Sequence, residues 1–163
     1  MRFNGSRDYA VPVDAVIAML QDEKNTIDKY ESMGHREVAI LEFVSNDEML
    51  RIVSSRVVDV ELPGFAKKAL KPTNTMVQTD EWHGHDDEWS GSFNVEVKGA
   101  PVRIAGTMSL TPAAGGSRHD VSIELQVKVP VIGNKIAAWV GTSEVQRTLD
   151  AEFAFNDARL AAQ

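Results

Sequence analysis

Residues 121–129, VSIELQVKV, alternate apolar and polar side chains without interruption. Val121, Ile123 and Leu125 share one face with the two valines that follow them, and the polar residues between share the other. Because side chains of a β-strand point to opposite faces in turn, the segment predicts a strand with one buried and one wet face. This strand therefore defines the inside and the outside of the sheet to which it belongs.

The same texture extends back toward residue 35. β-Branched and alternating residues are interrupted there only by turn signals. Strands are expected at residues 38–44, 49–58, 75–82, 89–97, 102–110 and 121–129. Their short connections, such as residues 83–87 and 112–116, predict an antiparallel meander, because parallel neighbours need crossovers of a dozen residues or more. Gly91 and Gly106 interrupt two apolar faces and predict bends in a curved sheet.

Short helices are expected before this region. A weak strand over residues 1–9 leads to Pro12, which suits the first turn of a helix that ends near Leu20. Asn25 is expected to cap a second short helix, which ends at Gly34.

A long helix is expected after the last strand, from residue 131 to 163. Its apolar stripe slips in phase at residues 141–143, where Ser143 and Gln146 fit a capping box. We expect a kink or break there and two halves that pack on different surfaces. The connection at residues 62–72 is bracketed by prolines and predicts a short, lid-like helix.

The composition limits the function more than it defines it. The length of 163 residues fits a single domain spanning residues 1–163. The formal net charge is −7. The acidic balance argues against a nucleic-acid partner. The lack of cysteine excludes disulfides, cysteine nucleophiles and thiolate metal sites. No apolar run approaches the ~18 residues of a membrane span, so a cytoplasmic location without stable membrane insertion is expected.

Three segments carry a resemblance to a known family. They are Tyr9-Ala10-Val11-Pro12, Leu62-Pro63-Gly64-Phe65, and Val129-Pro130-Val131-Ile132-Gly133-Asn134-Lys135-Ile136. With the order strand, two helices, six strands and helix, the chain resembles the START-like (SRPBCC, helix-grip) superfamily, which includes birch-pollen allergens, lipid-transfer START domains and polyketide aromatase/cyclases. It is most similar to an uncharacterised bacterial branch, a domain of unknown function.

The resemblance implies an α+β fold in which a curved antiparallel seven-stranded sheet wraps a long C-terminal helix. It also implies an apolar ligand cavity between the two, opening near the lid-like segment. The candidate wall residues are Trp89, Phe93, Ile104, Met108, Ile123, Leu125, Ile136 and Val140, with Phe65 and Leu70 at the mouth. The alternative for the same inward faces is solid packing.

The histidines are the first candidates for chemistry. His83 and His85 lie among five carboxylates in residues 80–89, a possible zinc shell, but the pattern lacks a fixed third ligand and favours a solvated hairpin tip. His35 and His119 have no evident partner for general-base work. We therefore expect no metal, no cofactor and no catalytic residue.

Charged residues give the other candidates. Arg51 and Arg103 would meet a ligand carboxylate if they pointed inward, but the outer face is favoured for both. Lys67, Lys68 and Lys71 form the only basic cluster, and three lysines are fewer than the 4 to 8 of typical membrane-binding patches, which favours a role in solubility.

We therefore expect the chain to bind or carry a small hydrophobic molecule, lipid-like or polyketide-like, without catalysis. One alternative is an aromatase/cyclase- or dehydratase-like enzyme that acts in the same cavity, with Glu42, Asp80 or Glu81 as the ionisable group. The other is a protein-interaction module with a solid core. The sequence does not indicate the oligomeric state.

Overall fold

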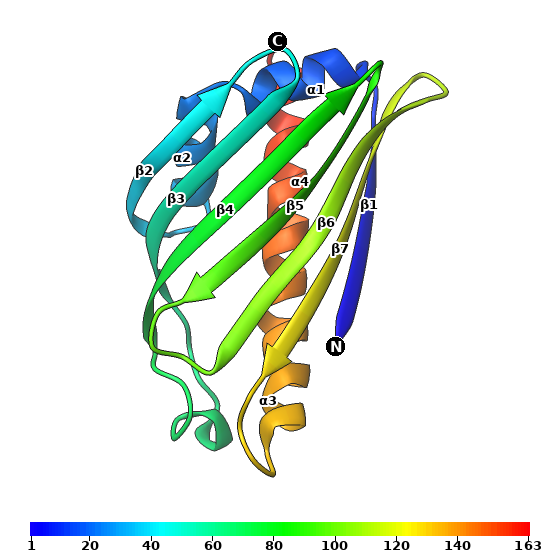
Figure 1. Cartoon of the computed structure of the whole chain (residues 1–163). Coiled ribbons are helices and arrows are strands. Elements are labelled where there is room, and N and C mark those ends of the chain that lie inside the picture. Colours follow the sequence, from blue (N-terminus) through cyan, green and yellow to red (C-terminus); the bar gives the residue numbers. More distant parts are fainter.

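Seven strands form one antiparallel sheet in the order β1-β7-β6-β5-β4-β3-β2. The computed structural model describes residues 1–163 (Figure 1). The strands are β1 (Arg2–Tyr9), β2 (Arg36–Ser45), β3 (Met49–Asp59), β4 (Thr73–His85), β5 (Glu88–Val97), β6 (Val102–Ala113) and β7 (Gly116–Val127). The predicted meander is confirmed, because β2 to β7 pair in chain order and β1 pairs with β7.

Two connections are shorter than predicted. β4 continues to His85 and β5 begins at Glu88, so most of the expected loop at residues 83–87 belongs to the hairpin strands. β6 and β7 likewise extend to Ala113 and from Gly116, which leaves a two-residue turn instead of the expected turn at 112–116. The paired backbone overrides local composition there, because every extra pair satisfies its N–H and C=O groups.

The short helices are α1 (Val13–Leu20) and α2 (Glu23–Ser32). Asp22 caps α2 by accepting a hydrogen bond from the Lys24 N–H, so the expected cap at Asn25 is wrong. The Asn25 amide instead donates to the Met19 carbonyl and ties α2 to α1. Gly34 follows α2 with a φ of 84°, the left-handed conformation expected there.

The C-terminal helix is irregular at the expected place, but it is not broken there. It consists of α3 (Gly133–Val140), a π-helical turn (Gly141–Val145) and α4 (Gln146–Ala161). The π turn holds an extra residue, which realigns the stripe after the phase slip. As a result both halves bury side chains in one apolar cluster and not on different surfaces. No capping box forms, because the Gln146 amide donates to Asp150.

The connection between β3 and β4 is helical as expected, but only over one turn. It contains a single 3₁₀ turn, Gly64–Ala66. Ala66 and Leu70 are buried in the apolar cluster around α3 and α4. In Figure 1 this connection lies beside the β7–α3 loop, at the end of the molecule opposite to α1.

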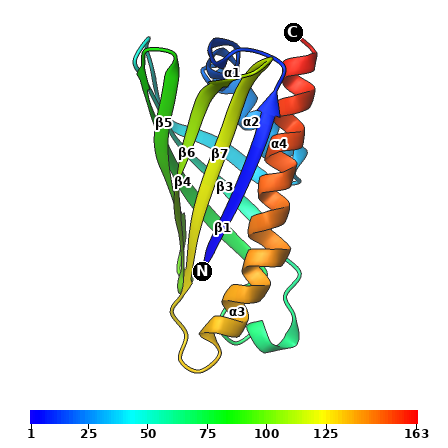
Figure 2. The same cartoon turned by 90° about the vertical axis from the view of Figure 1, so that its right-hand side faces the viewer.

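Two apolar clusters pack the concave side of the sheet. One joins α1 to β3, β4 and β5 and includes Val16, Leu50 and both Trp82 and Trp89. The other joins α3 and α4 to β7 and includes Ile123 and Phe153. Figure 2 shows the C-terminal helix running the length of one side of the sheet, so it contributes to both ends of the core.

Gly106 marks the closest approach on the inner face. A Cβ atom at this position would lie 2.1 Å from the Ser122 carbonyl oxygen and 2.5 Å from Cζ of Phe93. The Phe93 ring therefore lies against the Gly106 backbone, and only a residue without a side chain leaves room for it.

We predict that Gly106→Val destabilises the protein by about 3 kcal/mol, the upper range for overpacking, because neither the backbone nor the ring can yield freely. Gly64→Ala is the control, since nothing lies within 4 Å of the point that its added methyl carbon would occupy, and it should change the free energy by less than about 0.5 kcal/mol. Urea denaturation measures both. Equal stabilities of the two variants would contradict the prediction.

Candidate functional site: the cavity between the sheet and α4

A cavity of about 190 Å³ lies between the inner face of the sheet and the C-terminal helix. It is lined by 33 residues, of which 21 are hydrophobic. Strands β5 to β7 supply apolar wall residues such as Phe93, Ile104 and Val121, and the helix supplies Val140 and Leu149. Most of the cavity wall is therefore apolar.

Six of the ten candidate residues lie in the cavity wall. They are Leu70, Phe93, Ile104, Met108, Ile123 and Val140. The other four, Phe65, Trp89, Leu125 and Ile136, do not. The strand faces were assigned correctly from the alternation, so the difference lies in position along the sheet and not in orientation.

The four residues outside the wall pack at the ends of the molecule. Trp89 is buried in the cluster beneath α1, where its ring covers Gly84. Leu125 and Ile136 are 1% and 0% exposed and fill the core near α3. Phe65 lies under the Lys135 ammonium group, whose Nζ is 4.3 Å from the ring centroid.

One part of the cavity wall is polar, and of its charged residues the sequence had indicated only Asp80. Lys29 of α2, Arg56 of β3, Asp80 of β4 and Glu152 of α4 all line it. The Lys29 Nζ and Glu152 Oε1 atoms are 3.2 Å apart and form an ion pair. We refer to these four residues as the polar cluster.

Burial affects each acid of the polar cluster differently. Burial raises the pKa of Asp80, and the nearby Lys29 charge and the Gln78 hydrogen bond only partly oppose this rise. Burial would also raise the pKa of Glu152, but the Lys29 charge and hydrogen bond, together with the His119 and Arg56 charges, outweigh it, and the pKa lies below its ordinary value. For Lys29 itself the desolvation is outweighed mainly by Glu152, so its pKa is raised. The pair is therefore held in its charged form.

Arg56 has only neutral contacts. Its Nη2 donates to Oε1 of the Gln78 side-chain amide at 2.9 Å, and its guanidinium lies 3.9 Å from the Tyr30 ring centroid. The Gln78 amide in turn donates to Asp80 at 2.9 Å, so an amide separates the arginine from the acid. Both Nε and Nη1 of Arg56 are buried without a hydrogen-bond partner. A buried cation with two unused donors is costly, which favours the binding of an acceptor at this point of the wall.

The period-2 alternation could have located Arg56 as well as Asp80, which was already a candidate. Arg56 shares the inward face of β3 with Leu50 and Ile52, and Asp80 shares that of β4 with Trp82. Charged residues on an apolar face are usually turned outward, and this prior hid the signal. Lys29 and Glu152 carry no such signal, since only the packing of α2 against α4 joins them.

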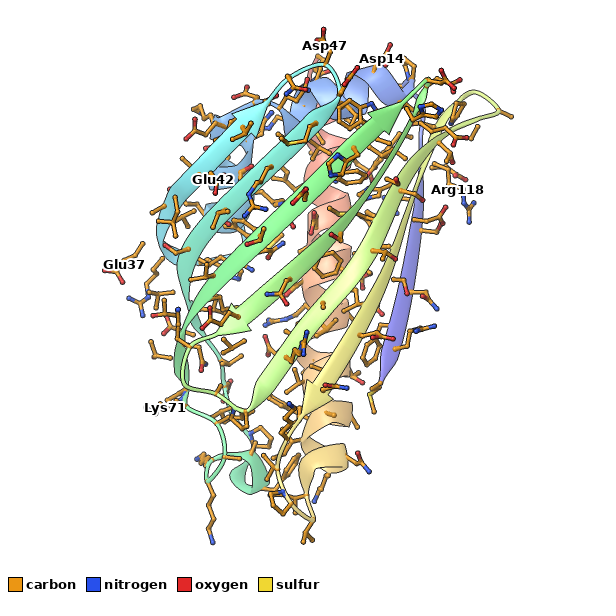
Figure 3. The ribbon with its side chains drawn as sticks, viewed as in Figure 1. Asp14, Glu37, Glu42, Asp47, Lys71 and Arg118 are labelled. Atoms are coloured by element: carbon orange, nitrogen blue, oxygen red, sulfur yellow. The ribbon has the colours of Figure 1, made fainter.

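The other charged candidates lie on the outer face, as expected for both arginines. Arg51 pairs with Glu42 and Glu81 at 3.2 and 2.9 Å, and Arg103 is exposed. Figure 3 shows Glu42 on the outer side of the sheet. Of the three acids considered for the cavity, only Asp80 reaches it.

The histidines divide into an outer and an inner pair. His83 bonds to Glu81 at 2.9 Å on the outer face, His85 lies beside Asp86, and no three His, Asp or Glu side chains form a metal-binding group. His119 lines the cavity, and its Nδ1 shares a hydrogen bond with the Tyr9 hydroxyl at 3.1 Å. Burial lowers the pKa of His119 to about 4. It lowers that of His35, helped by the Arg56 charge, to about 4 as well.

Solved structures with this architecture match nearly the whole chain. The crystal structure of Ara h 8.0201 has a TM-score of 0.62 at 11% identity, over 100% of this chain and 99% of that one. The STAR-related lipid transfer protein (fragment 25–204) from Xanthomonas axonopodis has a TM-score of 0.62 at 14% identity, over 98% and 85%. A START superfamily protein from Mycobacterium smegmatis has a TM-score of 0.54 at 15% identity, over 98% of each chain. The protein therefore has the START-like, helix-grip fold.

The sequence places it further. The family model described as "Protein of unknown function (DUF2505)" matches residues 4–160, and the chain belongs to this family. The uncharacterized proteins Rv0481c of Mycobacterium tuberculosis and Mb0491c of Mycobacterium bovis are each 29% identical over 117 residues, which is 65% of this chain and 67% of each relative. The expected resemblance to an uncharacterised bacterial branch of the superfamily is confirmed. No helix of the structure has the length and apolar character needed to span a membrane.

We predict that the protein loses stability as the pH falls from 6.5 toward 4. The pKa of His35 and of His119 is about 4 in the folded protein and 6.5 in the unfolded chain. As the pH falls through this window, the unfolded chain binds protons that the folded protein does not, so acid favours unfolding. Each contributes at most about 1.4 kcal/mol per pH unit in that window. His119→Gln should flatten the pH dependence of the unfolding free energy, measured in urea. His85→Gln, at a side chain that is 95% exposed, should leave the slope unchanged; an unchanged slope in both variants would refute the assignment.

Proposed function

We propose that the protein binds and carries a small amphipathic molecule, lipid-like or polyketide-like, in the cavity between the sheet and the C-terminal helix, without changing it chemically. The observation that carries this proposal is the cavity itself, whose wall is hydrophobic at 21 of 33 residues. The fold is shared with a STAR-related lipid transfer protein, which supports a ligand of the same general class.

The two alternatives have less support. An interaction module with a solid core does not leave a cavity of about 190 Å³ between its layers. An enzyme needs an acid or base that is free to move a proton. Here the Glu152 charge is paired with that of Lys29, and Asp80 accepts a hydrogen bond from Gln78. Burial lowers the pKa of His35 and His119, the two histidines of the wall, to about 4, which makes them weak bases.

The polar cluster defines how such a molecule would be oriented. Its apolar body would lie against the wall formed by β5, β6 and β7, because that part is hydrophobic. Its polar end would carry an oxygen acceptor and lie beside Arg56, where two buried donors have no partner. Both nitrogens lie beneath the cavity surface, so the guanidinium would shift toward the ligand as the hydrogen bonds form.

The first test asks whether the cavity takes up an apolar molecule. Ile104 lines the cavity, while Ala105, the next residue of β6, points to the other face. We expect Ile104→Trp to fill the space and reduce the affinity for a neutral hydrophobic dye at least about tenfold, because a filled cavity excludes the probe. Ala105→Trp should bind the dye as the wild type does. Fluorescence titration measures both, with thermal unfolding as the check on folding.

Native mass spectrometry of the purified protein, before and after organic extraction, complements this titration. An extractable mass would give the chemical class of the ligand. If the wild type takes up no dye and carries no extractable compound, the proposed function is wrong.

The second test addresses the polar end. We expect Arg56→Met to lower the affinity for a long-chain fatty acid about tenfold or more, because a charge-assisted hydrogen bond is lost. Arg51→Met removes an arginine from the outer face of the same strand and should leave the affinity unchanged. Isothermal titration calorimetry with the acid and with the alcohol of equal chain length measures both variants. Equal affinities of Arg56→Met and the wild type, with dye binding intact, would exclude Arg56 as the anchor but keep the cavity.

A further inference from the structure

Lysines gather at one end of the molecule. The chain has eight lysines, of which seven are exposed, and five of these seven lie in or beside two loops. Lys67, Lys68 and Lys71 come from the β3–β4 connection, and Lys128 and Lys135 flank the β7–α3 loop. We call these five residues the basic end. Figures 1 and 2 show both loops at the same end of the molecule, around α3, and Figure 3 shows Lys71 toward this end and Arg118 toward the other.

Packing contacts hold the two loops together. The Lys135 Nζ lies 4.3 Å from the centroid of the Phe65 ring, two residues before Lys67. Leu62 and Phe65 of one loop and Val129 and Ile132 of the other pack on the same apolar cluster. The backbone N–H of Lys128 donates to the Pro101 carbonyl at 2.8 Å, and this hydrogen bond joins the start of the β7–α3 loop to the β5–β6 connection. Lysines that are about sixty residues apart in sequence thus lie at the same end of the molecule.

None of the five lysines is paired. No carboxylate oxygen lies within 4 Å of the ammonium group of any of them. Most other basic side chains, by contrast, form ion pairs with carboxylates. These paired residues are Arg2, Arg7, Lys24, Arg36, Arg51, Lys98, Arg118, Arg147 and Arg159. Arg103, at the start of β6, is the one other exposed base without a partner. The net charge of −7 is therefore unevenly distributed, with the unpaired positive charge concentrated at this end.

An apolar side chain projects from the β7–α3 loop, between Lys128 and Lys135 in the sequence. Val131 is 101% exposed, the highest of the large apolar residues. Its φ of 69° places a β-branched residue in the left-handed region, which is strained for such a side chain. This arrangement does not stabilise the fold, because the fully exposed Val131 side chain buries no apolar surface. A strained turn that holds an apolar residue outward between lysines suits a contact outside the chain.

We propose that the basic end docks the protein on the surface of an anionic bilayer. Five lysines reach the 4 to 8 cations typical of such surfaces, where each raises the partition onto the membrane about fivefold. Val131 would enter the headgroup layer as the lysines contact lipid phosphates. The cavity wall at this end includes Leu62, Leu70, Lys71 and Trp139. If the proposed ligand binding holds, ligand would exchange with the bilayer here, but docking itself does not depend on it.

Vesicle co-sedimentation with the full chain tests docking. The wild type should bind vesicles of phosphatidylcholine with phosphatidylglycerol, and should not bind phosphatidylcholine alone. Lys67→Gln with Lys68→Gln should weaken binding about 25-fold, since two fivefold terms are removed. Lys24→Gln with Arg118→Gln removes the same charge from bases that are paired and should bind as the wild type does. Thermal unfolding and dye uptake show that each variant is folded with its cavity intact.

Val131→Asp, which keeps all five lysines, should also weaken binding to the anionic vesicles. The proposal is overturned if the wild type binds both vesicle types equally or neither. It is equally overturned if the control pair loses as much affinity as the Lys67/Lys68 pair, because bulk charge would then be responsible. Dye uptake without vesicle binding would leave the proposed function standing and remove docking alone.

Discussion

A curved sheet of seven strands exposes more concave apolar surface than one helix can cover, and this mismatch determines the rest of the structure. The helix formed by α3, the π turn and α4 runs the length of the sheet. It packs tightly against β7, where Leu125 and Ile136 are almost fully buried, and α1 closes the opposite end over Leu50 and Trp89. Between these two contacts the layers stay apart, and the cavity is what remains.

The π turn allows a single helix to serve both ends. A regular α-helix would rotate the residues after Gly141 away from the sheet, because their apolar stripe is out of phase with the residues before it. The extra residue of the turn brings Val145, Leu149 and Phe153 back to the core. Gly141 also lets β1 approach, since a Cβ atom there would lie 2.0 Å from Cζ of Phe3. The π turn thus keeps the apolar stripe of the helix facing the curved sheet on both sides of Gly141.

The polar cluster is expensive for stability, which is why it is informative about function. A buried ion pair such as Lys29–Glu152 roughly balances its own desolvation and adds little to the fold. Arg56 has no such compensation, since its contacts are an amide and a ring. Hydrophobic residues of similar size would stabilise the same positions better. A charge distribution of this kind, inside an otherwise apolar wall, is consistent with a site that recognises one end of a molecule.

The sequence by itself determined the faces of the strands and the order of β2 to β7 in the meander, because period-2 alternation and short turns are local properties. For the same reason it turned Ile104, Met108 and Ile123 inward and Arg51 outward. The START-like architecture followed from the resemblance to that superfamily. The sequence did not determine which inward residues border the cavity. Trp89 and Leu125 show the same alternation as Phe93, but helices pack over Trp89 and Leu125 and leave space beside Phe93.

The polar cluster and the basic end were likewise decided by the tertiary structure. Lys29 meets Glu152, and Lys135 lies over Phe65, only because α2, α4 and two loops pack at those points. A strand's period is set by its own backbone, but the encounter of residues far apart in the chain is set by the curvature of the whole sheet.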